Sequence, residues 1–235
     1  MKIIDPSFDI LSHLPREKAY EIIETAGRVC YRSEPRHKMQ EQFIKKIVRS
    51  GHESVIEHVS VTAKIVCDRG VSHELVRHRL ASYSQESTRY ANYAKEKFGR
   101  EITVVRPPFW QKGAGKFGEK SKEMFRWEQA MLAAEHSYVT LLDWGAKPEE
   151  ARSVLPNSLA TTIVISANVR EWRHIFKLRL SSRAHPQIRQ VMTLGFSQMV
   201  ALYPALFDDL PHPNLNGPGC DQALLGQDQG RQVAK

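Results

Sequence analysis

The sequence predicts a mixed α/β protein, because helical and strand-like apolar patterns are both distributed along its 235 residues. Apolar side chains recur every three or four positions in the predicted helices, which are 16–29, 37–51, 70–80, 121–144, 147–156, 169–180 and 188–207. Alternating or β-branched residues mark the predicted strands, which are 2–4, 59–68, 101–108 and 159–168. A hydrophobic fraction of 41% is that of an ordinary globular protein and supports a sizeable core.

Glycine and polar segments mark several boundaries of these elements. Gly51 closes one predicted helix and Gly145 follows another, and both are expected to act as stops. Cys67 shares the apolar face of the strand 59–68, so it is expected to be a buried small hydrophobe. The serine-rich segment 81–88 and the basic segment 109–122 are expected to be loops.

The length allows one large domain or two small ones, and the charge favours anionic partners. Residues 1–208 are predicted to form the domain and 209–235 a flexible polar tail. The net charge of +8 suits nucleic acid, phosphorylated small molecules or acidic membrane surfaces. Three widely spaced cysteines form neither a disulfide framework nor a zinc pattern and fit a reducing cytosol. No signal peptide or run of about 20 apolar residues is present, so a cytoplasmic location without a membrane span is expected.

The most informative stretch is RHRLASYSQESTR, from Arg77 to Arg89. It starts on a predicted helix and ends in a predicted loop, and its cations are followed by hydroxyl and amide side chains. Consecutive helical residues point about 100° apart, so Arg77, His78 and Arg79 cannot all face one ligand. The run therefore either fans out into solvent, as most basic runs do, or contacts more than one anionic group. Arginine beside serine, threonine and backbone N–H groups is suited to phosphate.

This stretch resembles the signature R-H-R-x-x-S-x-x-x-x-S-x-R of the flavin-dependent thymidylate synthases. Its fixed positions are occupied by Arg77, His78, Arg79, Ser82, Ser87 and Arg89. Three further segments resemble the family in the same order, namely GHESVIEH, EARSVLPNSL and ANVREWRHIFKLRL. The similarity covers roughly residues 1–206.

The resemblance implies a mixed α/β fold, with a central, mostly antiparallel sheet flanked by helices and a bundle of long helices. It implies a homotetramer whose active sites are shared between subunits. It also implies the conversion of dUMP to dTMP, with methylenetetrahydrofolate as carbon donor, NADPH as reductant and FAD as hydride carrier. None of the three cysteines lies in an activating context, so no cysteine nucleophile is expected. No nucleic acid, membrane or metal ion is expected to take part.

The family pattern also assigns roles to residues. The expected catalytic residues are Arg179 and His52. Arg179 would polarise the uracil and stabilise its ionised N3, and His52 and Ser54 would lie near the isoalloxazine or the ribityl chain. The expected cofactor-binding residues are Ser54, Arg77, His78, Arg79, Gln85, Asn168, Arg170 and His174. The expected substrate-binding residues are Glu74, Arg77, Gln85, Glu86, Ser87, Thr88, Arg89, Arg152 and Arg179. Of these, Ser87, Arg89 and the Thr88 backbone would hold the dUMP phosphate, with Arg152 coming from another subunit.

The sequence departs from the family pattern at a few positions. Glu74 stands where the family often has glutamine, and a carboxylate there would repel phosphate unless it pairs with an arginine. Ser84 and His174 each stand where asparagine is frequent. We expect these differences to alter contacts with FAD or folate but not the reaction.

Parts of the sequence are also compatible with two other classes of protein. A nucleic-acid-binding protein would use Tyr90, Tyr93 and Phe98 as a stacking platform beside the basic run. A metal-dependent hydrolase would use the histidines and glutamates of segment 52–58, but their spacing is not that of H-E-x-x-H. Neither alternative accounts for the other matching segments. Arg173 and Lys177 are expected to be solvated.

Overall fold

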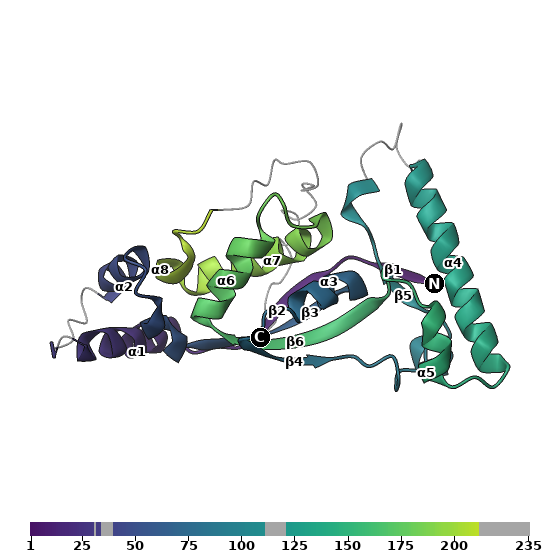
Figure 1. Cartoon of the computed structure of the whole chain (residues 1–235), viewed down its shortest axis with the longest axis horizontal. Helices are drawn as coiled ribbons and strands as arrows, with labels where there is room; N and C mark the ends of the chain where they lie inside the picture. The colour runs from purple at the N-terminus through teal and green to yellow at the C-terminus, as the bar shows by residue number, and fades with distance from the viewer. Residues whose placement is uncertain (31, 34–39, 111–120, 212–235) are drawn as a thin grey trace, which may run out of the picture.

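Figure 1 shows the computed structural model, which describes residues 1–30, 32–33, 40–110 and 121–211. Its centre is a four-stranded antiparallel sheet in the order β2-β3-β6-β4. These strands are β2 (Ser7–Ser12), β3 (Ser60–Asp68), β6 (Ala160–Asn168) and β4 (Ala81–Gln85). A second, two-stranded parallel sheet pairs β1 (Lys2–Ile4) with β5 (Thr103–Val105). The predicted mixed fold with a mostly antiparallel sheet is thus confirmed.

The alternating pattern of β3 explains why the sheet has one buried face. Val61, Ala63, Ile65 and Cys67 are at most 1% exposed, while the residues between them are partly exposed. β3 pairs with β6 along its whole length, from Ser60 opposite Asn168 to Asp68 opposite Ala160. The predicted burial of Cys67 is therefore correct.

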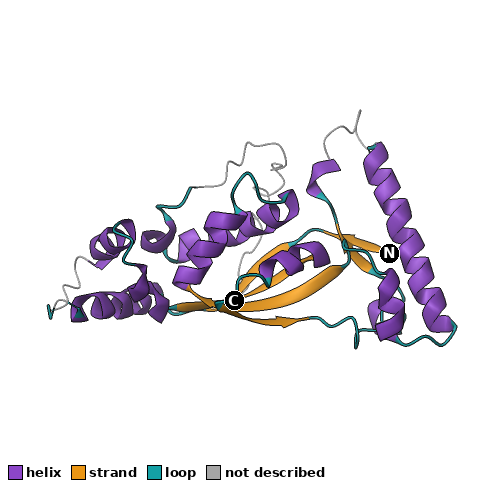
Figure 2. Ribbon diagram, viewed as in Figure 1, coloured by secondary structure: helices purple, strands orange, loops and turns teal. Residues whose placement is uncertain are grey.

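Among the described residues, helices cover one face of this sheet. Those over it are α3 (Arg69–Leu75), α6 (Val169–Arg179) and α7 (Pro186–Leu202). No helix covers the opposite face within the described part of the chain (Figure 2). The indole N–H of Trp172 donates to the Val61 carbonyl at 3.0 Å and ties α6 to the sheet. Gly195 allows α7 to lie close to β2, because a Cβ there would be 2.4 Å from the ring of Phe8.

The remaining helices lie at the two ends of the sheet (Figure 1). At one end are α1 (Arg16–Val29), α2 (Gln40–Arg49) and α8 (Pro204–Phe207). At the other are α4 (Lys122–Asp143) and α5 (Pro148–Ala151). Each end has apolar packing, and α4 covers a second core cluster that includes Trp127 and Tyr138. No described helix combines the length and apolarity needed to cross a membrane.

Several predicted boundaries are confirmed. The helix predicted at 16–29 has these bounds, and the one predicted at 121–144 begins after the N-cap Ser121. Gly51 and Gly145 follow helices with φ of 72° and 95°, the left-handed region in which glycine carries no Cβ penalty. The start of the predicted helix 37–51 and most of the loop 109–122 lie outside the described residues.

The local structure predicted around the stretch Arg77–Arg89 is wrong. The helix predicted over 70–80 ends at Leu75, and the predicted loop 81–88 begins with the strand β4. Two causes are visible. The Tyr83 hydroxyl lies 2.8 Å from the Leu75 carbonyl, and pairing of β4 with β6 requires an extended chain from Ala81 onward. Composition alone indicates a loop because only the outward-facing residues of this edge strand are serines.

Other differences have simple causes. The strand β2 was not predicted, and it forms because SFDILS can pair with β3. The helix predicted over 188–207 is divided into α7 and α8, because Pro204 cannot continue the helical hydrogen bonding. Near the C-terminal end of the described chain, Asp209 and Leu210 pack against the domain, although they lie beyond its predicted boundary at residue 208. Residues 212–235 lie outside the described residues.

Candidate active site

The RHR segment forms a turn that presents two cations to solvent and buries a histidine between them. Arg77 and Arg79 are exposed, whereas His78 is 5% exposed. The backbone N–H of Arg77 donates to the Glu74 carbonyl at 3.3 Å, but within the described part of the chain neither arginine side chain has a hydrogen bond or ion pair. Arg77, His78 and Arg79 therefore point in different directions, as predicted, but from a turn and not from a helix. The two arginine side chains stay available for an anion.

Arg179, at the end of α6, is anchored on this turn. Its Nη1 donates to Glu74 Oε2 at 2.7 Å, its Nη2 to the Glu74 carbonyl at 3.0 Å, and its Nε to His78 Nε2 at 3.0 Å. The Arg179 side chain is 20% exposed, so solvent still reaches it. Glu74, whose carboxylate was predicted to need an arginine partner, pairs with Arg179. The partner is the arginine predicted to bind uracil.

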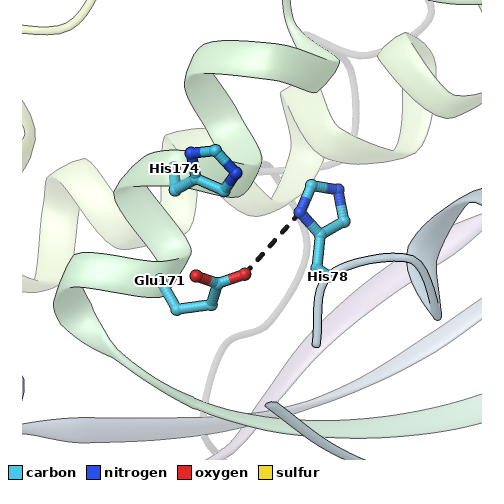
Figure 3. Close-up of side chains that lie close together, drawn as sticks. All are labelled: His78, Glu171 and His174. Carbon is cyan, nitrogen blue, oxygen red and sulfur yellow. Dashed lines mark ion pairs between the residues drawn. The ribbon is translucent and has the colours of Figure 1, made fainter. Parts of the chain in front are cut away.

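His78 also belongs to a cluster with Glu171 and His174 on α6 (Figure 3). His78 Nδ1 lies 3.7 Å from Glu171 Oε1, and the rings of His78 and His174 are 5.6 Å apart. Burial, followed by the charges of Arg179 and His174, lowers the pKa of His78 to about 4. Burial also raises the pKa of Glu171. His78 is therefore neutral at pH 7 and accepts from Arg179.

The depressed pKa of His78 predicts a specific pH dependence of stability. The unfolded chain has an ordinary histidine pKa near 6.5, so between about pH 6.5 and 4 it binds more protons than the folded chain. Stability should therefore fall as the pH is lowered through this window. We expect His78→Gln to remove about 3 kcal/mol of the pH 7 to pH 4 change in the free energy of unfolding. Urea denaturation at several pH values measures this change.

The exposed His136 on α4 provides the control. His136→Gln should leave the pH dependence close to that of the unmodified chain. An unchanged slope in the His78 variant would show that His78 titrates normally in the folded state.

The cluster of His78, Glu171 and His174 has the residue types of a metal site, with ligand atoms within 4.8 Å of one another. Its surroundings oppose a cation. Arg179 donates to Nε2 of His78, so the ring proton is on Nδ1 and neither nitrogen offers a free lone pair. The guanidinium would also repel a metal ion at this distance.

A second group of predicted residues follows β4 at its other end. Arg152 lies 3.4 Å from the Thr88 hydroxyl, and Arg89 lies 3.6 Å from Glu149. Ser87 accepts from the Arg89 backbone N–H. Arg152 was predicted to come from another subunit, but the structure places it beside Thr88 of the same chain. Hydroxyls, backbone N–H groups and two exposed arginines here are suited to a phosphate.

The neighbouring amide and carboxylate are already held by the fold. Gln85 donates to the hydroxyls of Ser72 and Thr161 at 2.9 and 3.2 Å. Glu86 accepts from the Tyr93 hydroxyl at 2.8 Å and borders a cavity of about 460 Å³. Glu101 borders the same cavity, and two carboxylates disfavour an anion inside it.

The GHESVIEH segment lies against α6. The 3₁₀ helix Glu53–His58 leaves His52 and Ser54 exposed, while Glu57 pairs with Arg170. Asn168 is the N-cap of α6 and accepts from the Glu171 backbone N–H at 2.9 Å. Three of the four matching segments therefore meet around α6 and the RHR turn, whereas EARSVLPNSL lies beside Thr88.

The expectation that Arg173 is solvated is wrong. Arg173 is 1% exposed and binds both carboxylate oxygens of Asp209, at 2.6 and 2.7 Å. It also donates to Glu53 at 3.3 Å and to the Leu206 carbonyl. Lys177, which is 46% exposed, fits the expectation. No local pattern separates these two cations, because the partners of Arg173 come from distant segments.

Comparison with known proteins is in accord with this arrangement. A family model described as Thymidylate synthase complementing protein matches residues 10–205. A flavin-dependent thymidylate synthase from Geobacter sulfurreducens is 37% identical over 220 residues, which are 90% of this chain and 87% of the relative. The chain belongs to the flavin-dependent thymidylate synthase family. A second member, from Mycobacterium sp. (strain JLS), is 35% identical and covers 80% of this chain and 78% of its own length.

Solved structures share the fold of this member of the flavin-dependent thymidylate synthase family. The UMP/dUMP methylase PolB from Streptomyces cacaoi, bound with 5-Br dUMP, aligns with a TM-score of 0.72 and 22% identity. The alignment covers 88% of this chain and 96% of that one. The same protein bound with 5-Br UMP gives a TM-score of 0.70. These structures therefore share the overall fold of this chain.

Proposed function

We propose that the chain is a flavin-dependent thymidylate synthase that methylates dUMP to dTMP in the cytoplasm. Family membership carries the proposal, and the two arginine-containing groups at the ends of β4 support it. In this reaction methylenetetrahydrofolate gives its one-carbon group to C5 of the uracil, and two electrons from NADPH reduce that carbon to a methyl group. All of these ligands are anions and suit the net charge of +8.

The RHR end fits FAD chemically. Arg77 and Arg79 are exposed cations without protein partners in the described residues, and a pyrophosphate needs such donors. The remainder of the cofactor would be held by residues of α6, of its N-cap and of the segment packed against it. These are Asn168 at the N-cap, Arg170 and His174 on α6, and His52 and Ser54 beside it. Bound FAD would supply hydride transfer, which no protein side chain provides.

The end with Ser87, Thr88, Arg89 and Arg152 would bind the dUMP phosphate. Arg179, which would bind the uracil, lies with the RHR turn on the other side of β4. The five residues of β4 span about 16 Å. This distance is too long for a single nucleoside monophosphate to contact both ends of the strand. One complete site would therefore combine the phosphate-binding residues of one subunit with Arg179 of another. The proposed homotetramer provides this arrangement, and the sheet face without helices offers a surface for association.

The cysteines support a route without an enzyme thiolate. Cys67 is fully buried, and burial raises its pKa far above the ordinary thiol value. Cys30 is exposed and follows α1, so it lies at a helix C-terminus, which does not stabilise a thiolate. Cys220 lies outside the described residues.

The flavin requirement provides a direct test of the proposed function. The purified protein should be yellow and should release FAD on denaturation. Arg79→Ala should weaken FAD binding by about 10- to 100-fold, because it removes a charge-assisted hydrogen bond to phosphate. Arg49→Ala, at an exposed arginine on α2, should bind FAD normally. A colourless protein that takes up no FAD on reconstitution would contradict the proposal.

A further inference from the structure

Arg179 depends on His78 for the orientation of its guanidinium. Its Nε donates to His78 Nε2 at 3.0 Å, and two contacts with Glu74 hold its Nη1 and Nη2. Nε belongs to the stem of the side chain, so a hydrogen bond at this atom fixes the plane of the whole group. Among the described residues, the other two of the five N–H groups have no partner, and their direction is set by these three contacts.

The hydrogen bond to Arg179 requires a particular arrangement of protons on His78. A neutral imidazole carries one N–H, and Nε2 accepts only when that N–H is on Nδ1. The other tautomer and the imidazolium would both turn an N–H towards the donor Nε of Arg179. The location of one proton on His78 therefore decides whether Arg179 is held.

Glu171 lies on the Nδ1 side of the His78 ring (Figure 3). Its Oε1 is 3.7 Å from Nδ1, which is longer than a hydrogen bond, so its effect on the ring is electrostatic. The side chains of Glu171 and His78 are 7% and 3% exposed, so solvent and salt screen this interaction little. A carboxylate at this distance favours an N–H on Nδ1 over a lone pair there.

The other polar groups around His78 do not act on Nδ1. The Tyr83 hydroxyl lies 2.7 Å from the His78 carbonyl and therefore holds the backbone and not the ring. His174 is exposed and packs edge-on, with its ring centroid 5.6 Å from that of His78. The Glu74 carboxylate binds the guanidinium on the Nε2 side. Among the described carboxylates, Glu171 is thus the one placed to select the tautomer.

We propose that Glu171 is a positioning residue that keeps the His78 proton on Nδ1, so that His78 accepts from Arg179 and orients this guanidinium towards the ionised N3 of the uracil. This inference rests on the proposed function. In this role Glu171 acts through His78 and does not touch the nucleotide. A hydrogen bond made before the ligand arrives spares the cost of ordering a long side chain during binding.

The tautomer is measured by ¹⁵N NMR of the histidine side chains at pH 7 in flavin-loaded protein, with His78→Gln to assign the signals. We expect the N–H of His78 on Nδ1 in the unmodified protein. Glu171→Leu removes the carboxylate and should shift the tautomer ratio about tenfold towards Nε2–H. Glu171→Gln has the same shape and keeps a neutral acceptor, so its shift should be smaller and in the same direction. This second variant carries the test if Glu171→Leu does not fold.

The consequence for the substrate is measured by calorimetric titration of dUMP into the flavin-loaded protein. Glu171→Leu should bind dUMP about tenfold more weakly, the effect of one hydrogen bond at Arg179. His78→Phe keeps a ring but offers no acceptor, so in this background Glu171→Leu should change the affinity by less than about twofold. A merely structural role of Glu171 would persist in both backgrounds. The matched control is Glu41→Leu, at an exposed glutamate in the first turn of α2, which should bind dUMP normally.

The outcomes separate this inference from the proposed function. Failure of the unmodified, flavin-loaded protein to bind dUMP would overturn both. Normal dUMP binding with the His78 proton on Nε2, or with an unchanged tautomer ratio in the Glu171 variants, would overturn the inference alone. Undiminished affinity in Glu171→Leu, or a loss that persists in the His78→Phe background, would also overturn the inference alone.

Discussion

Arg179→Ala should lower the turnover of dUMP by about 100- to 1000-fold while FAD stays bound, because it removes a preorganised cation from the nucleobase site. Three acceptors fix this guanidinium, at 2.7, 3.0 and 3.0 Å, so its loss is the loss of a group held in place for the ligand. Steady-state formation of dTMP and the visible spectrum of bound flavin measure the two properties separately.

The matched control is Arg106→Ala. Arg106, which follows β5, forms an exposed ion pair with Asp5 at 3.2 Å and takes no part in the proposed site. Its replacement should leave turnover within about twofold, since exposed ion pairs contribute little. Full activity of Arg179→Ala would show that the uracil role assigned to this arginine is wrong.

Arg173→Met should lower the free energy of unfolding by about 2–3 kcal/mol, because it removes a buried cation from the partly exposed carboxylates of Asp209 and Glu53. Burial alone would raise the pKa of Asp209, but the hydrogen bonds and charge of Arg173 leave it below its ordinary value. Glu53 keeps Lys177 as a partner at 3.2 Å, so Asp209 suffers most. Urea denaturation measures the change in the free energy of unfolding.

A double variant distinguishes loss of the ion pair from poor packing of the new side chain. Arg173→Met combined with Asp209→Leu removes both charges, and it should recover a large part of the stability lost in the single variant. If the double variant is as unstable as the single one, the loss comes from packing and not from the orphaned carboxylate.

The sequence predicts the long regular elements of this fold well. The helix Arg16–Val29, the helix after Ser121 and the strand β6 have strong periodicity and clear ends. It predicts short elements poorly when a partner decides their conformation. β4 is a strand because β6 pairs with it, although its serines indicate a loop.

The same limit applies to the site. Motif spacing identifies the RHR turn and the Ser87–Arg89 segment, but it cannot show that β4 separates them. The side-chain partners are equally hidden. Nothing local to Glu74 or Arg173 indicates that they bind Arg179 and Asp209, which are 105 and 36 residues away along the chain.

The most direct measurement of the central claim is dTMP formation from dUMP with methylenetetrahydrofolate and NADPH. It should be carried out on flavin-loaded protein, on flavin-stripped protein and on the variant Cys30→Ser/Cys67→Ala/Cys220→Ser. We expect dTMP from the loaded protein and from the folded, loaded triple variant, and none from the stripped protein until FAD is restored. No dTMP from the loaded protein, dTMP without flavin, or loss of turnover in the triple variant would contradict it.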